Sequence, residues 1–130
     1  DQSRDHEMPV DVWYPATNAH AGEDFDPDKM ARYEIVPGLG ESAQHAVMNA
    51  ESEPGCFPLV VFSHGYGGER RQSTFFYTHL ASHGFVVAAM DHVGNTTINM
   101  IRVNQKRETS NLCAALFCPD LRMQVLLLIR

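Results

Sequence analysis

Two short, uninterrupted runs of hydrophobic residues, 59–62 and 85–90, dominate the pattern along this chain. Between them, residues 72–83 place apolar side chains four positions apart, and Gly84 follows where a helix would end. The pattern predicts a strand, a glycine-rich turn, a helix and a second strand over residues 57–92. Strands that are apolar along their whole length are covered on both faces, so we expect an α/β fold with a mostly parallel sheet flanked by helices.

One alternating segment precedes these runs. Val-Asp-Val-Trp-Tyr at 10–14 is rich in β-branched and aromatic residues and stops at Pro15, which is typical of a short strand. We therefore predict a first strand within residues 8–16. Residues 17–56 are mostly polar and small, and we expect them to form an irregular connection with one short helix that Asp26 would cap.

The last part of the chain, residues 93–130, is expected to form a loop and helices. One helix is predicted near 98–107 and a final helix from about Pro119. The final helix still carries apolar positions when the sequence reaches Arg130, so we expect the chain to be cut within a longer domain. A parallel sheet interrupted there would leave an unpaired apolar edge, and the isolated chain is expected to be aggregation-prone or only partly ordered.

Composition and charge narrow the classes of partner. The chain has 130 residues, of which 44% are hydrophobic and 20% charged, enough for one globular core. Its net charge of −6 argues against nucleic acid or an anionic membrane as the main partner, because both require a basic face. The apolar runs are far shorter than the roughly 20 residues of a membrane span. The first residues are polar, with no signal-peptide core, which leaves the compartment open.

The turn after the first apolar run is the most informative feature for function. Glycines just beyond the carboxyl end of a buried strand let the backbone approach a ligand and direct N–H groups into the crevice there. A dinucleotide site is disfavoured because Arg70 stands where G-x-G-x-x-G requires its third glycine, and no Gly-Lys-Ser/Thr follows for a Walker loop. The turn consists of His64, Gly65, Tyr66, Gly67 and Gly68.

Two catalytic interpretations of this turn compete. Ser63-His64-Gly65 matches the second half of the nucleophile motif G-x-S-x-G, but Val61 replaces the first glycine and would crowd the sharp turn. His64 is unsuited as the base, because adjacent residues leaving a strand point to opposite faces. An oxyanion loop fits better: a backbone N–H there would face the developing charge of a tetrahedral intermediate, a contact worth about 10²- to 10³-fold in rate.

Two segments resemble the platelet-activating factor acetylhydrolase and predicted dienelactone hydrolase group of α/β-hydrolases: PLVVFSHGYGG at 58–68 and LASHGFVVAAMDH at 80–92. VDVWYP at 10–15 resembles the first strand of that group. The resemblance implies an ester hydrolase that uses Ser, His and Asp, with the backbone N–H of Tyr66 as one oxyanion donor. It also implies that the stretch ending at Arg130 is the helix before the nucleophile strand, and it is compatible with a secreted or periplasmic compartment.

The chain departs from that group in one respect that matters for mechanism. Neither G-x-S-x-G nor G-x-C-x-G occurs in the 130 residues, and in α/β-hydrolases the acid and the histidine follow the serine along the chain. We therefore expect residues 1–130 to be a partial domain, truncated before the nucleophile strand and inactive alone. In the full-length protein its substrate would be a carboxylic ester or a phospholipid acyl ester. The alternative is a non-catalytic α/β binding module that is complete at this length.

Two polar residues at the end of the second apolar run are further candidates. Asp91 and His92 follow that strand at the same edge of the predicted sheet as the glycine turn. We expect His92 at the rim of the site. Asp91 either lines the site or fixes the following turn by bonding to backbone N–H groups.

Metal-binding patterns are weak. His79 and His83 have the i, i+4 spacing of zinc ligands, but Leu80 stands where a metalloprotease helix carries Glu. The acidic run at 24–28 begins like a calcium loop and then lacks the required glycine. Three cysteines without C-x-x-C spacing indicate neither a disulfide framework nor a thiolate zinc site. We expect no metal and no cofactor.

Overall fold

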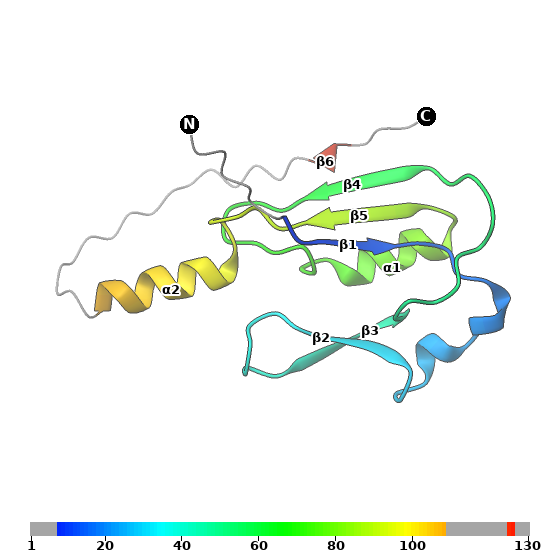
Figure 1. Cartoon of the computed structure of the whole chain (residues 1–130), viewed down its shortest axis with the longest axis horizontal. Coiled ribbons are helices and arrows are strands. Elements are labelled where there is room, and N and C mark those ends of the chain that lie inside the picture. The colour runs from blue at the N-terminus through cyan, green and yellow to red at the C-terminus, as the bar shows by residue number, and fades with distance from the viewer. Residues whose placement is uncertain (1–7, 109–124, 127–130) are drawn as a thin grey trace.

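The computed structural model describes residues 8–108 and 125–126 of the chain, which form a four-stranded sheet, a two-stranded hairpin and two α-helices (Figure 1). Within these residues, no helix is both long enough and apolar enough to cross a membrane. In chain order the elements are β1 (Val10–Trp13), the 3-10 turns η1 (Asn18–His20) and η2 (Glu23–Phe25), β2 (Met30–Glu34), β3 (Glu41–Val47), β4 (Leu59–Ser63), α1 (Thr74–Ser82), β5 (Val86–Met90), α2 (Thr97–Glu108) and β6 (Val125–Leu126).

The predicted strand, turn, helix and strand over 57–92 are confirmed as β4, α1 and β5. The two strands pair in parallel, with Leu59 opposite Val86 and Ser63 opposite Met90. The helix ends as its sequence predicts: Gly84 adopts φ +83°, its N–H bonds the carbonyl of Ala81, and the next N–H bonds that of Leu80. This pair of bonds satisfies helix-end carbonyls and turns the chain into β5.

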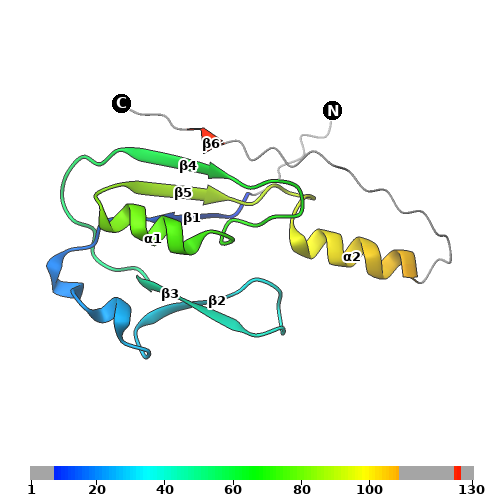
Figure 2. The same cartoon turned by 180° about the vertical axis from the view of Figure 1, so that it is seen from behind.

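The expectation of a mostly parallel sheet flanked by helices is wrong for the described residues. The strand order is β1-β5-β4-β6, and only β4 and β5 are parallel, because β1 runs antiparallel to β5 and β6 runs antiparallel to β4. Figures 1 and 2 show α1 on one face of the sheet, and no described helix covers the other. Val12 and Leu59 are accordingly about half exposed. Apolar composition indicates that a strand is interior to a sheet, but it carries no information on direction.

The core lies between the sheet and α1. Alternate residues of β4 and β5 point to this side and are buried: Val60, Phe62, Val87 and Ala89. Tyr77 of α1 is fully buried against them, with ring centroids 4.7 Å from Trp13 and 5.0 Å from Phe62. This packing fixes α1, and with it the loop that precedes the helix.

A further correction concerns residues 17–56, for which the sequence predicts an irregular connection. The connection contains an antiparallel hairpin of β2 and β3. Asp26 caps no α-helix and instead makes a turn, in which its carboxylate accepts from the N–H of Asp28 at 3.0 Å. Contacts distant in sequence stabilise the hairpin, among them the Trp13 Nε1 to Gln44 Oε1 hydrogen bond of 2.9 Å. The amino-acid composition of residues 17–56 gives no indication of such contacts.

For residues 93–130, the structure confirms one predicted helix and contradicts part of the other. The helix expected near 98–107 is confirmed as α2. The final helix expected from Pro119 lies mostly outside the described residues, but Val125–Leu126 form a strand beside β4, so the helix is wrong at these two positions. A short apolar run has no period that separates strand from helix, and pairing with a neighbouring strand decides between them.

Candidate functional site

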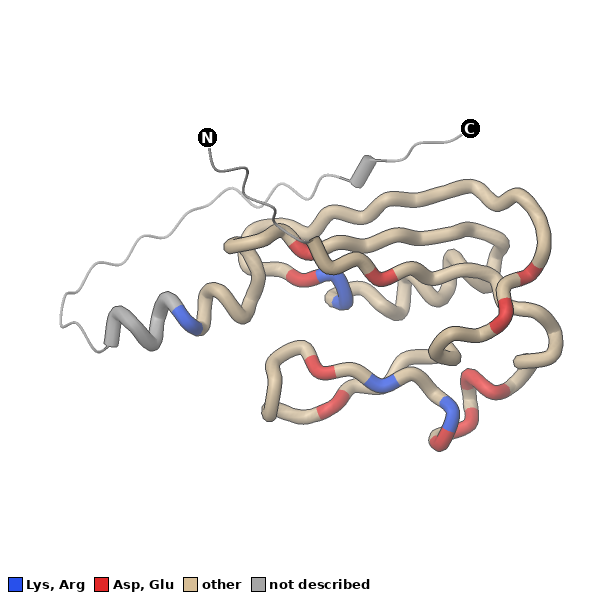
Figure 3. Tube along the Cα trace, viewed as in Figure 1, with Lys and Arg blue, Asp and Glu red and all other residues tan. Residues whose placement is uncertain are grey.

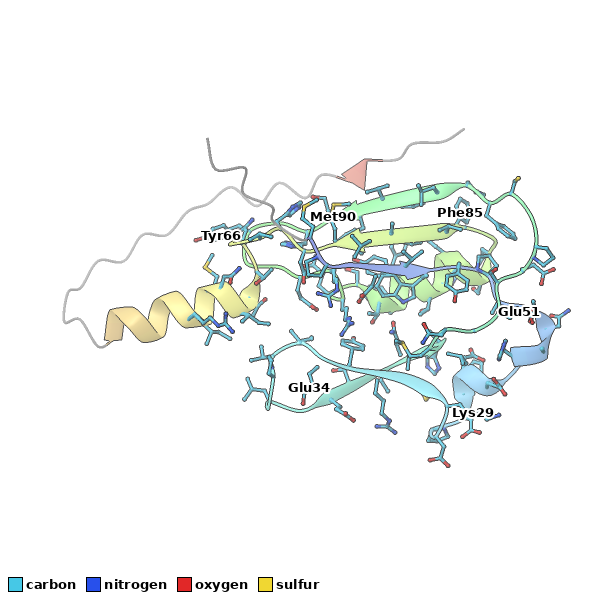
Figure 4. All side chains as sticks on the ribbon, viewed as in Figure 1. Lys29, Glu34, Glu51, Tyr66, Phe85 and Met90 are labelled. Atoms are coloured by element: carbon cyan, nitrogen blue, oxygen red, sulfur yellow. The ribbon has the colours of Figure 1, made fainter. Side chains whose placement is uncertain are left out.

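The site lies where β4 and β5 end. Because the two strands are parallel and Ser63 pairs with Met90, the segments that follow them leave the sheet at the same edge. Figure 4 shows Tyr66 and Met90 near each other at this edge, with Phe85 at the opposite end of β5. In open α/β sheets this edge is where ligands bind, and the glycine turn is therefore placed as the sequence predicts.

The turn itself is a compact, hydrogen-bonded loop. The N–H of Gly68 donates to the carbonyl of Gly65 at 3.1 Å, and Gly67 adopts φ +70°. A Cβ on Gly68 would lie 3.0 Å from the Cβ of His64 and 3.2 Å from the carbonyl oxygen of Gly65, and it would displace the Gln72 side chain. Glycine is therefore favoured at both 67 and 68, for backbone conformation at one position and for space at the other.

The start of α2 anchors the far side of this turn. The Thr97 hydroxyl donates to the carbonyl of Gly67 at 2.7 Å, and the Thr97 N–H donates to that of Gly68 at 3.2 Å. The side-chain oxygen of Asn95 accepts from the N–H of Gly67 at 3.4 Å. The turn is thus tied to the segment after β5 by the carbonyls of Gly67 and Gly68 and by the N–H of Gly67.

Tyr66 is the residue of the turn most open to solvent. The residue is 72% exposed. Among the described residues, no hydrogen bond uses its backbone N–H, whereas the N–H groups of Gly67 and Gly68 are both engaged. An N–H left free at the carboxyl end of a parallel strand can bind an anionic oxygen.

His64 lies under the turn, with its side chain fully buried. Its Nδ1 is 2.7 Å from the carbonyl oxygen of Gly65, and its Nε2 accepts from the backbone N–H of His92 at 3.0 Å. The ring centroids of His64 and His92 are 4.7 Å apart. His64 therefore connects the turn to the residue that follows β5.

Ser63 has a partner that the sequence analysis missed. Its Oγ lies 2.7 Å from Nε2 of His92, so the two side chains share a hydrogen bond at the site. The signal that could have revealed it is the parallel register: Ser63 ends β4 opposite Met90, and His92 follows two residues later. Along the chain the nearest histidine to Ser63 is His64, but the structure places His92 next to the hydroxyl.

Asp91 bonds to the loop before α1. One carboxylate oxygen accepts from the backbone N–H of Arg70 at 2.6 Å, and the other pairs with the Arg70 guanidinium. Of the two roles expected for Asp91, bonding to backbone N–H groups is the one that the structure contains, but the N–H belongs to this loop and not to the turn after β5. Asp91 therefore holds the end of β5 to the loop that follows the glycine turn.

Arg70 and Arg71 also bind Asp11 of β1. The Asp11 carboxylate lies 3.0 Å from Nε of Arg70 and pairs with Nε of Arg71. Figure 3 shows this basic pair among acidic positions beside the end of the sheet. Burial alone would raise the pKa of Asp11, but the hydrogen bond and charge of Arg71, with those of Arg70, outweigh it and hold the pKa below its ordinary value. Two strands, β1 and β5, are thereby linked by charge to the loop before α1.

Replacing Glu69 with Gln is expected to stabilise the protein at pH 7. Burial, with the nearby charge of Asp91, raises the pKa of Glu69, and its Oε1 is buried without a hydrogen-bond partner in the described residues. A raised pKa means that the native state loses stability as the pH rises through that value. Glu69→Gln avoids this loss, and the gain should stay below about 1 kcal/mol because the group is partly solvated.

Urea denaturation of both proteins at pH 7 and at acid pH checks this result. The gain should vanish once the pH is well below the ordinary glutamate value of 4.5, because the carboxyl is then protonated in both states. The same change at Glu53, which is exposed, is the matched control and should alter stability little at either pH. A gain of equal size at both pH values would contradict the explanation.

The weaker candidates stay apart from this site. The rings of His79 and His83 are 4.3 Å apart between centroids and tilted by 45°, and within residues 8–108 and 125–126 no group of three or more His, Cys, Asp or Glu residues could hold a metal ion. Cys56 is an exposed free thiol. A pocket of about 530 Å³ lies between β1, the β2-β3 hairpin and α1; its lining includes Trp13 and Tyr33 but none of residues 63–68.

Comparison with known proteins points to one family. The family model described as "Platelet-activating factor acetylhydrolase, isoform II" matches residues 1–116. Platelet-activating factor acetylhydrolase from Bos taurus is 43% identical over 55 residues, which is 42% of this chain and 12% of the relative. The proteins of the same name from Cavia porcellus and Canis lupus familiaris are 50% and 53% identical over 36 residues, 28% of this chain and 8% of each relative. A search of solved structures gives no significant match.

Proposed function

Because the chain belongs to the platelet-activating factor acetylhydrolase isoform II family, we propose that it is the N-terminal part of a longer serine ester hydrolase. The observation that carries the proposal is the backbone N–H of Tyr66, which meets no acceptor among the described residues and lies in a tightly held turn at the carboxyl end of β4. The segments matched in the curated relatives span about a tenth of their length, so most of the enzyme would lie beyond the matched region.

In this proposal the chain supplies an oxyanion donor. The Tyr66 N–H would hydrogen-bond the carbonyl oxygen of the substrate as it becomes negatively charged in the tetrahedral intermediate. A donor fixed in advance costs no reorganisation during the reaction, which is why one such contact is worth about 10²- to 10³-fold in kcat. His64, Gly65, Gly67 and Gly68 shape the loop, and His92 lies at its rim.

The remaining catalytic groups would come from outside the chain. No G-x-S-x-G occurs here, and in this class of hydrolase the nucleophilic serine precedes the acid and the histidine. The substrate that we propose is a small carboxylic ester or a phospholipid acyl ester. The family match does not favour a non-catalytic binding module.

Two measurements test the proposal. The coding sequence beyond Arg130 should contain G-x-S-x-G within a few tens of codons, whereas a stop codon directly after Arg130 would support the binding module. The 130-residue chain should hydrolyse p-nitrophenyl acetate no faster than buffer does, because without a nucleophile no acyl-enzyme can form. Turnover by the short chain that Ser63→Ala abolishes would place the nucleophile in the Ser63 and His92 pair instead.

A further inference from the structure

We propose that His64 is a positioning residue that sets the direction of the Tyr66 N–H by holding the carbonyl of Gly65. This inference rests on the proposed function, because it concerns the same oxyanion donor. It assigns to a histidine with a fully buried side chain a role that is exerted through the peptide it holds.

The hydrogen bonds of His64 determine its protonation state. A backbone N–H is only a donor, so the N–H of His92 requires a lone pair on Nε2 of His64. A carbonyl is only an acceptor, so the Gly65 oxygen requires a proton on Nδ1. The Asp91 carboxylate is 3.8 Å from Nε2, beyond hydrogen-bonding distance, and its nearer oxygen is occupied by the Arg70 N–H. His64 is therefore the neutral tautomer with hydrogen on Nδ1.

The Gly65 carbonyl is the group that this tautomer holds. It accepts from Nδ1 of His64 at 2.7 Å and from the N–H of Gly68 at 3.1 Å. Two donors fix the carbonyl on the inner side of the turn, towards the buried imidazole.

The same peptide unit carries the oxyanion donor. The Gly65 carbonyl and the Tyr66 N–H belong to one planar peptide, and none of the described peptide bonds is cis. In a trans peptide the C=O and N–H point in opposite directions. Drawing the Gly65 carbonyl inwards therefore directs the Tyr66 N–H outwards, away from His64, where it meets no acceptor among the described residues.

His64 also relates the donor to β5. Its Nε2 is bound by the N–H of His92, whose ring binds Ser63, so the imidazole is held from the neighbouring strand. A rigid, buried ring thus fixes the orientation of the Tyr66 peptide relative to the sheet. A flexible or missing side chain at 64 would leave Gly68 as the single donor to the Gly65 carbonyl.

Three substitutions in the full-length protein test separately the two hydrogen bonds of the His64 imidazole, one to Gly65 and one to His92. The amide nitrogen of His64→Asn lies near the place of Nδ1 and can still donate to Gly65. His64→Gln reaches the place of Nε2 and can accept from His92 but leaves Gly65 without its donor, and His64→Ala removes both. With p-nitrophenyl butyrate we expect the His64→Gln and His64→Ala variants to lower kcat about tenfold with little change in KM. The His64→Asn variant should keep most of the kcat of the unmodified protein.

Equal losses of kcat in all three variants, or losses confined to KM, would overturn the inference. Tyr66→Pro is assayed beside them. If Tyr66→Pro leaves kcat unchanged, the oxyanion assignment itself fails. If Tyr66→Pro lowers kcat but the His64 variants do not, the oxyanion assignment stands and only the role of His64 fails. A measurement on the unmodified protein does not depend on whether the variants fold. The ¹⁵N NMR shifts of the His64 ring should show the Nδ1-H tautomer, and an Nε2-H or doubly protonated ring would refute the proposal.

Discussion

Replacing Tyr66 with proline in the full-length protein is expected to lower kcat for a small ester by about 10²-fold or more. Proline has no backbone N–H, so the substitution removes the proposed oxyanion donor itself. The N–H groups of Gly67 and Gly68 are already engaged by Asn95 and Gly65, so they are not free to replace it. The kcat for p-nitrophenyl acetate or butyrate, measured at saturating substrate, gives the size of the loss.

Tyr66→Phe is the matched control. It keeps the N–H and removes only the phenol oxygen of a residue that is 72% exposed, so kcat should stay nearly unchanged. Proline can also distort a turn, so circular dichroism must show that the fold survives. A correctly folded Tyr66→Pro enzyme with the kcat of the unmodified protein would refute the oxyanion assignment, and a large loss with Phe would move the effect to the side chain.

Replacing Tyr77 with alanine is expected to lower the free energy of unfolding by about 3–5 kcal/mol, the usual cost of emptying a buried aromatic site. Tyr77 is 0% exposed, and its ring packs against those of Trp13 and Phe62. These three rings come from α1, β1 and β4, so the cavity would open between the helix and the sheet. Urea denaturation of the full-length protein measures the change.

Tyr77→Phe separates the ring from its hydroxyl. The hydroxyl is buried and makes no hydrogen bond in the described residues, and its burial raises the pKa of Tyr77. Removing a buried polar group that has no partner costs little or is stabilising, so we expect a change within about 1 kcal/mol. A loss with Phe as large as that with Ala would show that the hydroxyl, and not the packing of the ring, carries the stability.

The unit from β4 to β5 could be predicted because its signals are local. Apolar runs, helical spacing and a glycine after the helix each depend on neighbours within a few residues, and the structure has the strand, helix, Gly84 at φ +83° and the parallel strand. The glycine turn could be placed at the sheet edge for the same reason. That the Tyr66 N–H meets no acceptor within residues 8–108 and 125–126 depends on the hydrogen bonds around it, and those involve Thr97 and Asn95, about thirty residues away.

The hairpin and the antiparallel strand β1 could not be predicted in this way. β2 and β3 lie in a polar segment whose stability comes from distant partners, such as Trp13 with Gln44 and the Tyr14 hydroxyl with the carbonyl of Ala50 at 2.7 Å. For β1, the alternating pattern predicts a strand, but pairing with β5 decides its direction.

By itself, the sequence determined which segments are strands and helix around the glycine turn, and that Gly84 ends the helix. These properties follow from side-chain size and from backbone conformations within a few residues. Only the tertiary structure decided that His92 bonds both Ser63 and His64, and that Asp91 binds the loop before α1. These pairs join the ends of two parallel strands to each other and to the loop before α1, and their geometry depends on the register and on the packing of α1, which no local pattern specifies.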